Sequence, residues 1–235
     1  MSLLLTGLIF CLGFFVESII GFGGTLVAFS ILGFFFDIKE LILIALYIAT
    51  SASIFVIASD YKSFNGKIFL KALPFCFIGT ILGVSSFLWI SSEDLLIVFA
   101  IFLILLAFKV IFFDDIKFPK IFTKIILLIG GFSQGIFGIG GPFFSIALRS
   151  KFHNKSEARA TMAMFFITFN LVRVIQMSLQ NKFSTEHFLE FWWVVIPLIF
   201  AIHLGHIIHG RISEKAFKNM IAGMALLAGI EFLFK

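Results

Sequence analysis

Several long apolar runs, divided by short polar stretches, restrict this chain to one broad class of protein. A helix needs roughly 20 mostly apolar residues to cross a membrane, and the chain offers several runs of that length. Its 235 residues are 60% hydrophobic and only 13% charged, whereas a soluble domain has about 25% charged residues. We therefore expect an all-α integral membrane protein without a soluble domain. The first residues lack a basic segment, which argues against a cleaved signal peptide.

Charge and cysteine content exclude several other classes. The net charge of +5 is not gathered into a basic stripe on a polar surface, so nucleic acid is not an expected partner. Cys11 and Cys76 lie in apolar runs, which indicates buried small hydrophobic residues rather than a disulfide or a metal pair. No nucleophile with a base and no complete metal set appears. We therefore expect no cofactor and no enzymatic activity.

Two glycine clusters indicate an internal repeat. They read GFGG at 21–24 and GIGG at 138–141, and a shift of 117 positions superimposes them. The same shift places Glu17 on Gln134. Glycine weakens a helix, and so the repeat predicts that a helix is broken at the same point in both halves.

The hydrophobic pattern follows one plan in both halves. A glycine-broken segment comes first, at 3–36 and again at 121–149, and three unbroken spans follow each of them. We therefore predict two repeats, 1–117 and 118–235, which together form one membrane domain. The unbroken spans are expected at 40–59, 68–90, 94–113, 157–180, 187–209 and 214–234.

Basic residues in the loops decide how the broken segments lie. If each broken segment crosses the membrane, eight Lys and Arg residues fall on either side. If each is a re-entrant hairpin, thirteen fall on one side and three on the other. Since Lys and Arg favour the cytoplasmic side, we predict inverted repeats, each a re-entrant hairpin followed by three transmembrane helices. This topology puts both termini outside the cytoplasm, and we expect the bacterial inner membrane.

The breaks suggest a binding site for an anion. Broken helices in inverted repeats often build a transporter's substrate site near the midplane. Half-helices that begin near Gly24 and Gly141 would present free backbone N–H groups and a positive helix end. Pro142 suits the first turn of such a helix. Alternatively, the glycines only permit tight helix packing. The glycines assigned to substrate binding are Gly21, Gly23, Gly24, Gly138, Gly140 and Gly141.

Polar residues inside the spans are further candidates. Arg173 lies in the middle of TFNLVRVIQMSLQ, and a charge within the membrane indicates function by default. Its guanidinium can grip a sulfonate or carboxylate with two parallel hydrogen bonds. Asn170 shares its helix face, and Ser51 and Gln134 are expected to line the same cavity. The alternatives are an ion pair for Arg173 and hydrogen bonds from Ser51 to its own helix.

Glu17 lies one turn before the first break and has three open interpretations. It is a candidate for proton coupling, a partner for Arg173, or the acceptor of a hydrogen bond that packs helices together. Its counterpart Gln134 cannot titrate, so any proton coupling would be asymmetric.

His203, His206 and His209 form an H-x-x-H-x-x-H row. The spacing puts neighbouring histidines on one helix face, and histidine is a common metal ligand. No carboxylate or cysteine accompanies them, so interfacial histidines are the favoured interpretation. His203 and His206 are kept only as weak metal-binding candidates.

The paired motifs GFGG and GIGG resemble those of the TauE/SafE sulfite-exporter family. The stretches ATSASIFVIASDYKSFNGKIF and SEARATMAMFF are also similar to family segments that follow each motif. The resemblance implies a membrane permease for sulfite, sulfonates or related small anions. Where family motifs often carry a third glycine, this chain has Thr25 and Pro142. Thr25 would then donate its hydroxyl to the anion or cap the half-helix.

These observations predict a secondary transporter, expected to export a small anion such as sulfite, thiosulfate or an organosulfonate by alternating access. The anion would bind between the two glycine tips. One alternative is an anion channel that uses the same tips, and a weaker one is a divalent-metal transporter that uses the histidines. The expected partners are the lipid bilayer, the anion and a coupling proton. The sequence leaves a homodimer open.

Overall fold

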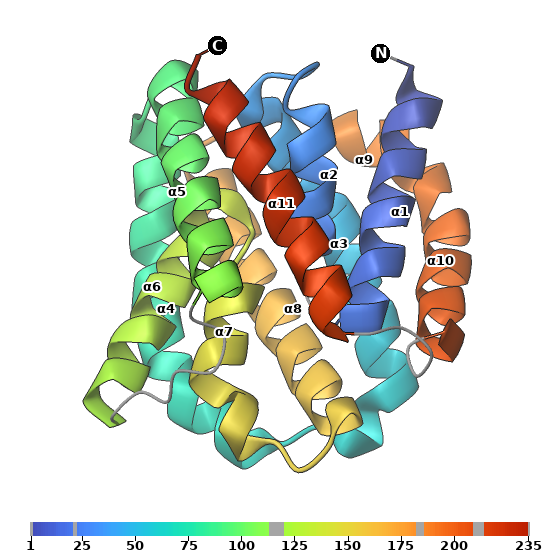
Figure 1. Ribbon diagram of the computed structural model, residues 1–235, viewed down its shortest axis with the longest axis vertical. Coiled ribbons are helices and arrows are strands. Elements are labelled where there is room, and N and C mark those ends of the chain that lie inside the picture. Colours follow the sequence, from blue (N-terminus) through green and yellow to red (C-terminus); the bar gives the residue numbers. More distant parts are fainter. Residues whose placement is uncertain (1, 21–22, 113–119, 182–185, 209–213, 235) are drawn as a thin grey trace. The chain divides into compact units, whose positions relative to one another are not determined.

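The computed structural model describes residues 2–20, 23–112, 120–181, 186–208 and 214–234, and these are almost entirely helical (Figure 1). No β-strand occurs in those ranges. The α-helices are α1 (Leu3–Ile20), α2 (Gly24–Leu32), α3 (Ile38–Asp60), α4 (Gly66–Trp89), α5 (Ser92–Phe112), α6 (Lys120–Phe137), α7 (Gly141–Leu148), α8 (Lys155–Leu179), α9 (Glu186–Phe191), α10 (Val195–Ile208) and α11 (Glu214–Phe232). Short 3₁₀ helices lie at Tyr61–Ser63 (η1), Arg149–Lys151 (η2) and Trp192–Val194 (η3).

Four stretches are long and apolar enough to cross a membrane, and each coincides with a predicted span. They are Ile38–Ser63, Gly66–Trp89, Ser156–Leu179 and Leu189–Ile208. The chain is therefore an all-α, multi-pass membrane protein. The two other predicted spans correspond to α5 and α11, and their membrane crossing stays a prediction. Instead of one continuous helix over 187–209, η3 separates α9 from α10, just before Pro197. Proline lacks the N–H that would bond to the preceding turn.

The chain divides into two compact units. Unit 1 comprises Met1–Ala45, Ile90–Lys117 and Glu190–Lys235, and unit 2 comprises Leu46–Trp89 and Phe118–Leu189. Each unit contains segments from both halves of the sequence, so the units are not the two repeats. The repeat boundaries and the inversion of the halves stay predictions.

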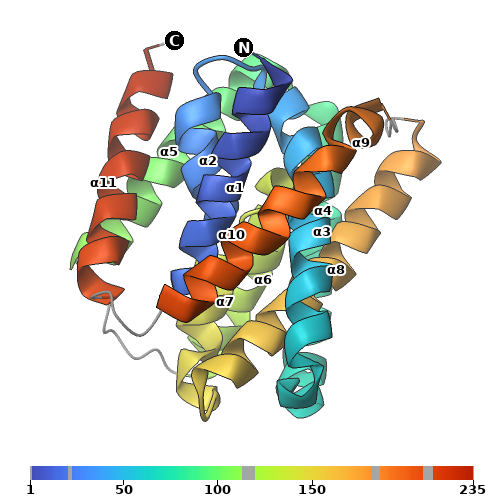
Figure 2. The ribbon, with the colours of Figure 1, turned by 90° about the vertical axis from the view of Figure 1, so that its right-hand side faces the viewer.

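In unit 1, α1 and α2 form a helical hairpin, and α10 packs along α1 (Figure 2). Small residues permit the close approach, because Gly13 lies against the backbone of Gly24 and Gly205 lies against Ser18. Helix α11 packs on α2 and α5. There Phe29 meets Phe99 edge-on with ring centroids 5.6 Å apart. This apolar contact fixes the half-helix α2 within unit 1.

In unit 2, α6 and α7 form the second helical hairpin, and α6 packs along α4. Each of these helices carries a G-x-x-x-G pair at the contact, Gly79 and Gly83 on α4 and Gly131 and Gly135 on α6. The backbones touch at these positions, as small residues allow between membrane helices. The Thr80 hydroxyl also donates to the Gly131 carbonyl at 3.2 Å. Close glycine packing therefore occurs at the α4–α6 contact as well as at Gly24, next to the first break.

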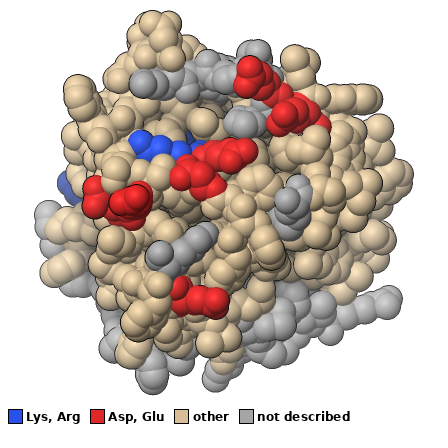
Figure 3. Space-filling view, turned by 90° about the horizontal axis from the view of Figure 1, so that it is seen from above, with Lys and Arg blue, Asp and Glu red and all other residues tan. Residues whose placement is uncertain are grey.

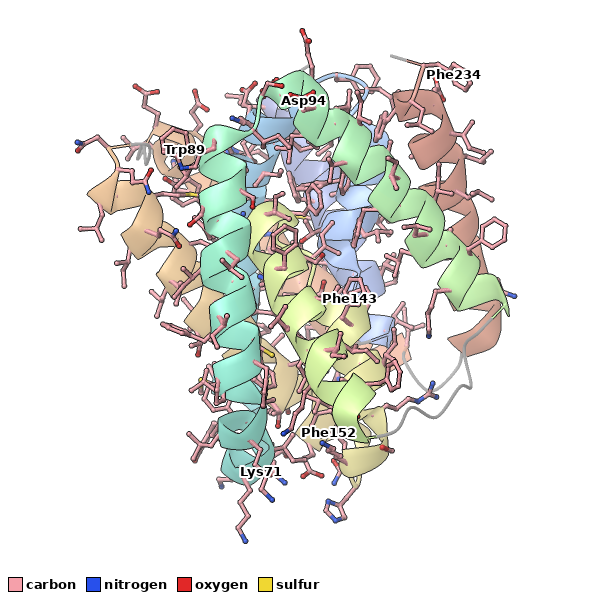
Figure 4. All side chains as sticks on the ribbon, turned by 90° about the vertical axis from the view of Figure 1, so that its left-hand side faces the viewer. Lys71, Trp89, Asp94, Phe143, Phe152 and Phe234 are labelled. Carbon is pink, nitrogen blue, oxygen red and sulfur yellow. The ribbon has the colours of Figure 1, made fainter. Side chains whose placement is uncertain are left out.

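A polar cluster lies at one end of unit 2. Arg159, near the start of α8, forms an ion pair with Asp60 at the end of α3. The Asn65 amide donates to Glu157 at 2.5 Å. In Figure 4, Lys71 and Phe152 also lie at this end and Trp89 at the other. The re-entrant path of the α6–α7 segment through the membrane stays a prediction.

Acidic residues lie in the first turns of α3 and α5, and both of these turns belong to unit 1. Glu40 lies in the first turn of α3, and Glu93 and Asp94 lie in the first turn of α5. Ser92 donates to the Asp37 carboxylate at 3.1 Å and joins these two helix starts. Figure 3 shows several acidic side chains on the face seen from above.

Candidate functional site

The turn between α6 and α7 is held by its own hydrogen bonds. The Gly138 N–H donates to the Gln134 carbonyl at 3.0 Å, and the Gly140 N–H donates to the Gln134 side-chain carbonyl at 2.8 Å. The Ser133 hydroxyl donates to the Ile139 carbonyl at 2.6 Å. Gly138 has φ of 75°, a left-handed conformation that favours glycine. The donors of Gly138 and Gly140 are therefore used within the hairpin rather than directed at a ligand.

A chain of side-chain amides leads away from this turn. The Gln134 amide donates to the Asn170 carbonyl at 3.1 Å, and the Asn170 amide donates to the Thr50 hydroxyl at 3.0 Å. Thr50 in turn donates to the Leu46 carbonyl of its own helix at 2.6 Å. The chain joins α6, α8 and α3 within unit 2. It brings together two predicted site residues, Gln134 and Asn170, which are both 1% exposed.

Arg173 lies beside this chain and is also 1% exposed. Its Nη1 atom is 3.5 Å from the Asn170 carbonyl oxygen, at the limit of a hydrogen bond. The same nitrogen is 2.9 Å from where a Cβ atom would lie at Gly138. Nε and Nη2 are buried and have no hydrogen-bond partner among the described residues. The guanidinium thus adjoins the second glycine turn and keeps two donors unused.

The first break is organised differently. The Gly24 N–H, at the start of α2, donates to the Glu17 carboxylate at 2.8 Å. Our expectation of a free N–H at Gly24 was therefore wrong, because the chain's own carboxylate occupies the positive end of the helix. This contact is a hydrogen bond of the kind that the helix-packing interpretation of Glu17 expects, and proton coupling by Glu17 stays a prediction. An ion pair of Glu17 with Arg173 stays a prediction, since they belong to different units.

The remaining residues of the first break are only partly described. Gly21 lies outside the described residues. Gly23 has φ of 102° and precedes α2 as its N-cap. Thr25 is buried one residue inside the helix, so it does not cap it, and the prediction that it donates to an anion stays untested. At the second break, α7 begins at Gly141 and Pro142 lies in its first turn, as expected.

The remaining predicted residues are Ser51, the histidines and the cysteines. The Ser51 hydroxyl donates to the Tyr47 carbonyl of its own helix at 3.0 Å, which was the alternative interpretation. His203 and His206 are exposed on α10, and His209 lies outside the described residues. No group of three or more His, Cys, Asp or Glu residues that could hold a metal occurs in the part of the chain that the structure describes. Cys11 and Cys76 are buried free thiols, as predicted.

Two polar residues of unit 2 were not predicted as site residues. Ser133 precedes Gln134 in an apolar run, and this was the available signal. Gln176 lies three residues after Arg173, and its amide donates to the Ile81 carbonyl at 3.3 Å and to the Ser85 hydroxyl at 2.8 Å. Its buried carbonyl oxygen has no partner among the described residues.

Comparison with known proteins agrees with the glycine motifs. The family model described as sulfite exporter TauE/SafE matches residues 5–232. Searches of curated proteins and of solved structures gave no match. The family match covers nearly the whole chain, including both glycine breaks and the buried Arg173. The chain therefore belongs to the sulfite exporter TauE/SafE family of membrane transporters.

Proposed function

We propose that the protein is a secondary transporter that binds a small sulfur oxyanion at Arg173, beside the second glycine turn, and exports it by alternating access. Sulfite, thiosulfate and organosulfonates are the proposed substrates. One observation carries the proposal: the Arg173 guanidinium is buried, yet two of its nitrogens have no partner among the described residues.

The energetics of burial support this role for Arg173. A buried donor without a partner costs about 1–3 kcal/mol, and a charge within the membrane adds to that cost. Protein groups lower this cost only in part, since among the described residues only Asn170 accepts a hydrogen bond from the guanidinium, at 3.5 Å. An anion would supply both the missing acceptors and the opposite charge.

Gly138 supports the proposal by leaving space beside the cation. A side chain there would begin 2.9 Å from Nη1 of Arg173 and would push the guanidinium aside. The glycine therefore serves two purposes, the left-handed turn and the close approach of Arg173 to the backbone.

The first break enters the proposal through the sequence repeat and through Glu17. We assign Glu17 as the coupling carboxylate, because it is the acidic residue next to that break. Protonation would weaken its hydrogen bond to the Gly24 N–H, since a neutral carboxyl accepts less strongly than a carboxylate. Such a change would tie the conformation of the α1–α2 hairpin to proton binding.

The proposed location is the bacterial inner membrane, with both termini outside the cytoplasm. The uneven distribution of loop Lys and Arg residues supports this orientation. Single cysteines can test it in a chain that lacks Cys11 and Cys76. We expect a membrane-impermeant thiol reagent to label a Ser2→Cys variant from outside intact cells. A Lys62→Cys variant should be labelled only after lysis. Labelling of both sites from the same side would contradict the topology.

Anion flux into proteoliposomes tests the function. We expect Arg173→Ala to reduce flux of labelled sulfite at least about 100-fold, the size of effect expected for removing a buried charged contact. Thr168→Val is the matched control, because the Thr168 hydroxyl donates only to the Met164 carbonyl of the same helix, at 2.8 Å. Wild-type flux by a folded Arg173→Ala protein would refute the role of Arg173. Saturable counterflow would exclude a channel.

A further inference from the structure

The two edges of the Arg173 guanidinium have different surroundings. Nη1 faces Asn170 and Gly138. Nε and Nη2 are the nitrogens without a partner among the described residues. In a guanidinium, the N–H groups of Nε and Nη2 point the same way from one edge. The unused donors therefore form one continuous edge rather than two separate points.

The amides of Gln134 and Asn170 are already used. The Gln134 carbonyl accepts from Gly140, and its amide donates to Asn170. The Asn170 carbonyl accepts from Gln134 and from Nη1 of Arg173, and its amide donates to Thr50. Each of these amides contacts protein groups at both its oxygen and its nitrogen. Their role is therefore to hold the guanidinium and the turn rather than to bind the substrate directly.

We propose that Arg173 binds its anion through two parallel hydrogen bonds from the Nε–Nη2 edge, and that Asn170, Gln134 and Thr50 are positioning residues that fix the orientation of the guanidinium. The inference rests on the proposed function and adds how its substrate is recognised. The favoured anions carry at least two oxygens on one central atom, as sulfites, sulfonates and carboxylates do. A monatomic anion cannot accept both hydrogen bonds along their preferred directions.

The hydrogen-bond chain explains how the edge is fixed. Thr50 accepts from the Asn170 amide and donates to its own helix, so the Asn170 carbonyl must face Gln134 and Arg173. That carbonyl is the one described acceptor for Nη1. If the Asn170 side chain turned round, its NH₂ group would face the guanidinium and repel it. Thr50 therefore controls the guanidinium without touching it.

Binding of probe anions to the purified full-length protein in detergent tests the proposal. Methanesulfonate and acetate carry at least two oxygens on one central atom, and bromide is a single atom of the same charge. We expect both oxyanions to bind wild type at least about tenfold more tightly than bromide, because one lost charge-assisted hydrogen bond is worth about 1.5–3 kcal/mol. Equal dissociation constants for methanesulfonate and bromide would overturn the inference.

A pair of Thr50 variants tests the positioning role. Thr50→Val removes the hydroxyl with little change of volume, and Thr50→Ser keeps it. We expect Thr50→Val to lower the ratio of oxyanion to bromide affinity towards one, and Thr50→Ser to retain the wild-type ratio. Thr168→Val also removes a hydroxyl, in this case from α8, but Thr168 is not part of the hydrogen-bonded chain of Gln134, Asn170 and Thr50. This variant should leave the affinity ratio unchanged. A purely structural role would lower stability in Thr50→Val but leave the ratio unchanged, and that result would refute the positioning role.

Arg173→Lys separates failure of this inference from failure of the proposed function. Lysine keeps the charge but lacks the two-donor edge. We expect this variant to bind methanesulfonate and bromide with similar, weak affinity. If wild type binds both anions alike and Arg173→Ala binds neither, Arg173 is the anion site but its edge does not select. If Arg173→Ala binds methanesulfonate as wild type does, the proposed function itself fails.

Discussion

The two glycine breaks share a backbone design but differ in charge. In each, a side chain one turn before the break accepts a hydrogen bond from a glycine N–H after it, at 2.8 Å in both cases. The acceptor is the carboxylate of Glu17 at the first break and the neutral amide of Gln134 at the second. A carboxylate satisfies the positive end of its half-helix. The neutral amide leaves the charge of Arg173 for another partner, which we propose is the substrate.

The breaks also pack in a reciprocal way. The first hairpin packs through α1 on α10, which belongs to the second half of the sequence. The second hairpin packs through α6 on α4, which belongs to the first half. A shift of 117 positions relates α4 to the region of α10. Helices at matching sequence positions thus support both hairpins, and the functional difference that we propose rests on a few side chains.

The largest effect is expected when the second break is given the charge of the first. Gln134→Glu would place a carboxylate beside Asn170, which itself accepts a hydrogen bond from Arg173. We expect methanesulfonate affinity to fall about 100-fold, because an internal anion competes for the guanidinium. Isothermal titration would measure the loss, with Arg173→Ala as the reference. Wild-type affinity in a folded Gln134→Glu protein would show that the charge difference between the breaks is not decisive.

The reverse exchange, Glu17→Gln at the first break, should separate anion binding from proton coupling. Glu17→Gln keeps an acceptor for the Gly24 N–H but removes the charge. We expect anion counterflow to remain within about threefold of wild type, since neutral and charged acceptors differ modestly for one hydrogen bond. Transport driven by a pH gradient should be lost. A fully pH-driven Glu17→Gln transporter would exclude Glu17 as the coupling group.

Alanine at the two left-handed glycines should sharpen the contrast. Both substitutions impose a left-handed strain of about 1–2 kcal/mol. At Gly138 the new Cβ would also press on Arg173, whereas at Gly23 no atom of the described residues, chain neighbours apart, would lie within 4 Å of it. We expect Gly138→Ala to lower thermal stability and anion affinity, and Gly23→Ala to lower thermal stability alone. Equal effects on affinity would remove the special role of the second turn.

The smallest effect is expected at Ser133. Its counterpart in the first break is Val16, so Ser133→Val makes the second turn resemble the first. The substitution removes the hydrogen bond to the Ile139 carbonyl and should cost about 1 kcal/mol of stability. Thermal unfolding in detergent would measure it, and anion selectivity should not change. A large change in selectivity would mean that Ser133 acts on Arg173.

Local patterns predicted the helices well. Apolar runs placed four of the crossings, and the glycine clusters placed the starts of α2 and α7. These features depend on hydropathy and backbone freedom, which a sequence displays directly. The G-x-x-x-G contact of α4 with α6 was also visible as a pattern. The choice of partner helix was not, because each apolar helix has several apolar neighbours available to it.

The sequence by itself determined that this is a membrane protein with two broken helices, a buried arginine and a resemblance to sulfite exporters. Only the tertiary structure decided how the polar side chains are used. Gln134 and Asn170 lie 36 residues apart, and Asn170 and Thr50 lie 120 apart, yet they form one hydrogen-bonded chain. Buried polar groups must find partners wherever the fold brings them together. The Gly24 N–H meets that requirement with the Glu17 carboxylate. The Nε and Nη2 atoms of Arg173 have no such partner among the described residues, and we propose that the substrate supplies it.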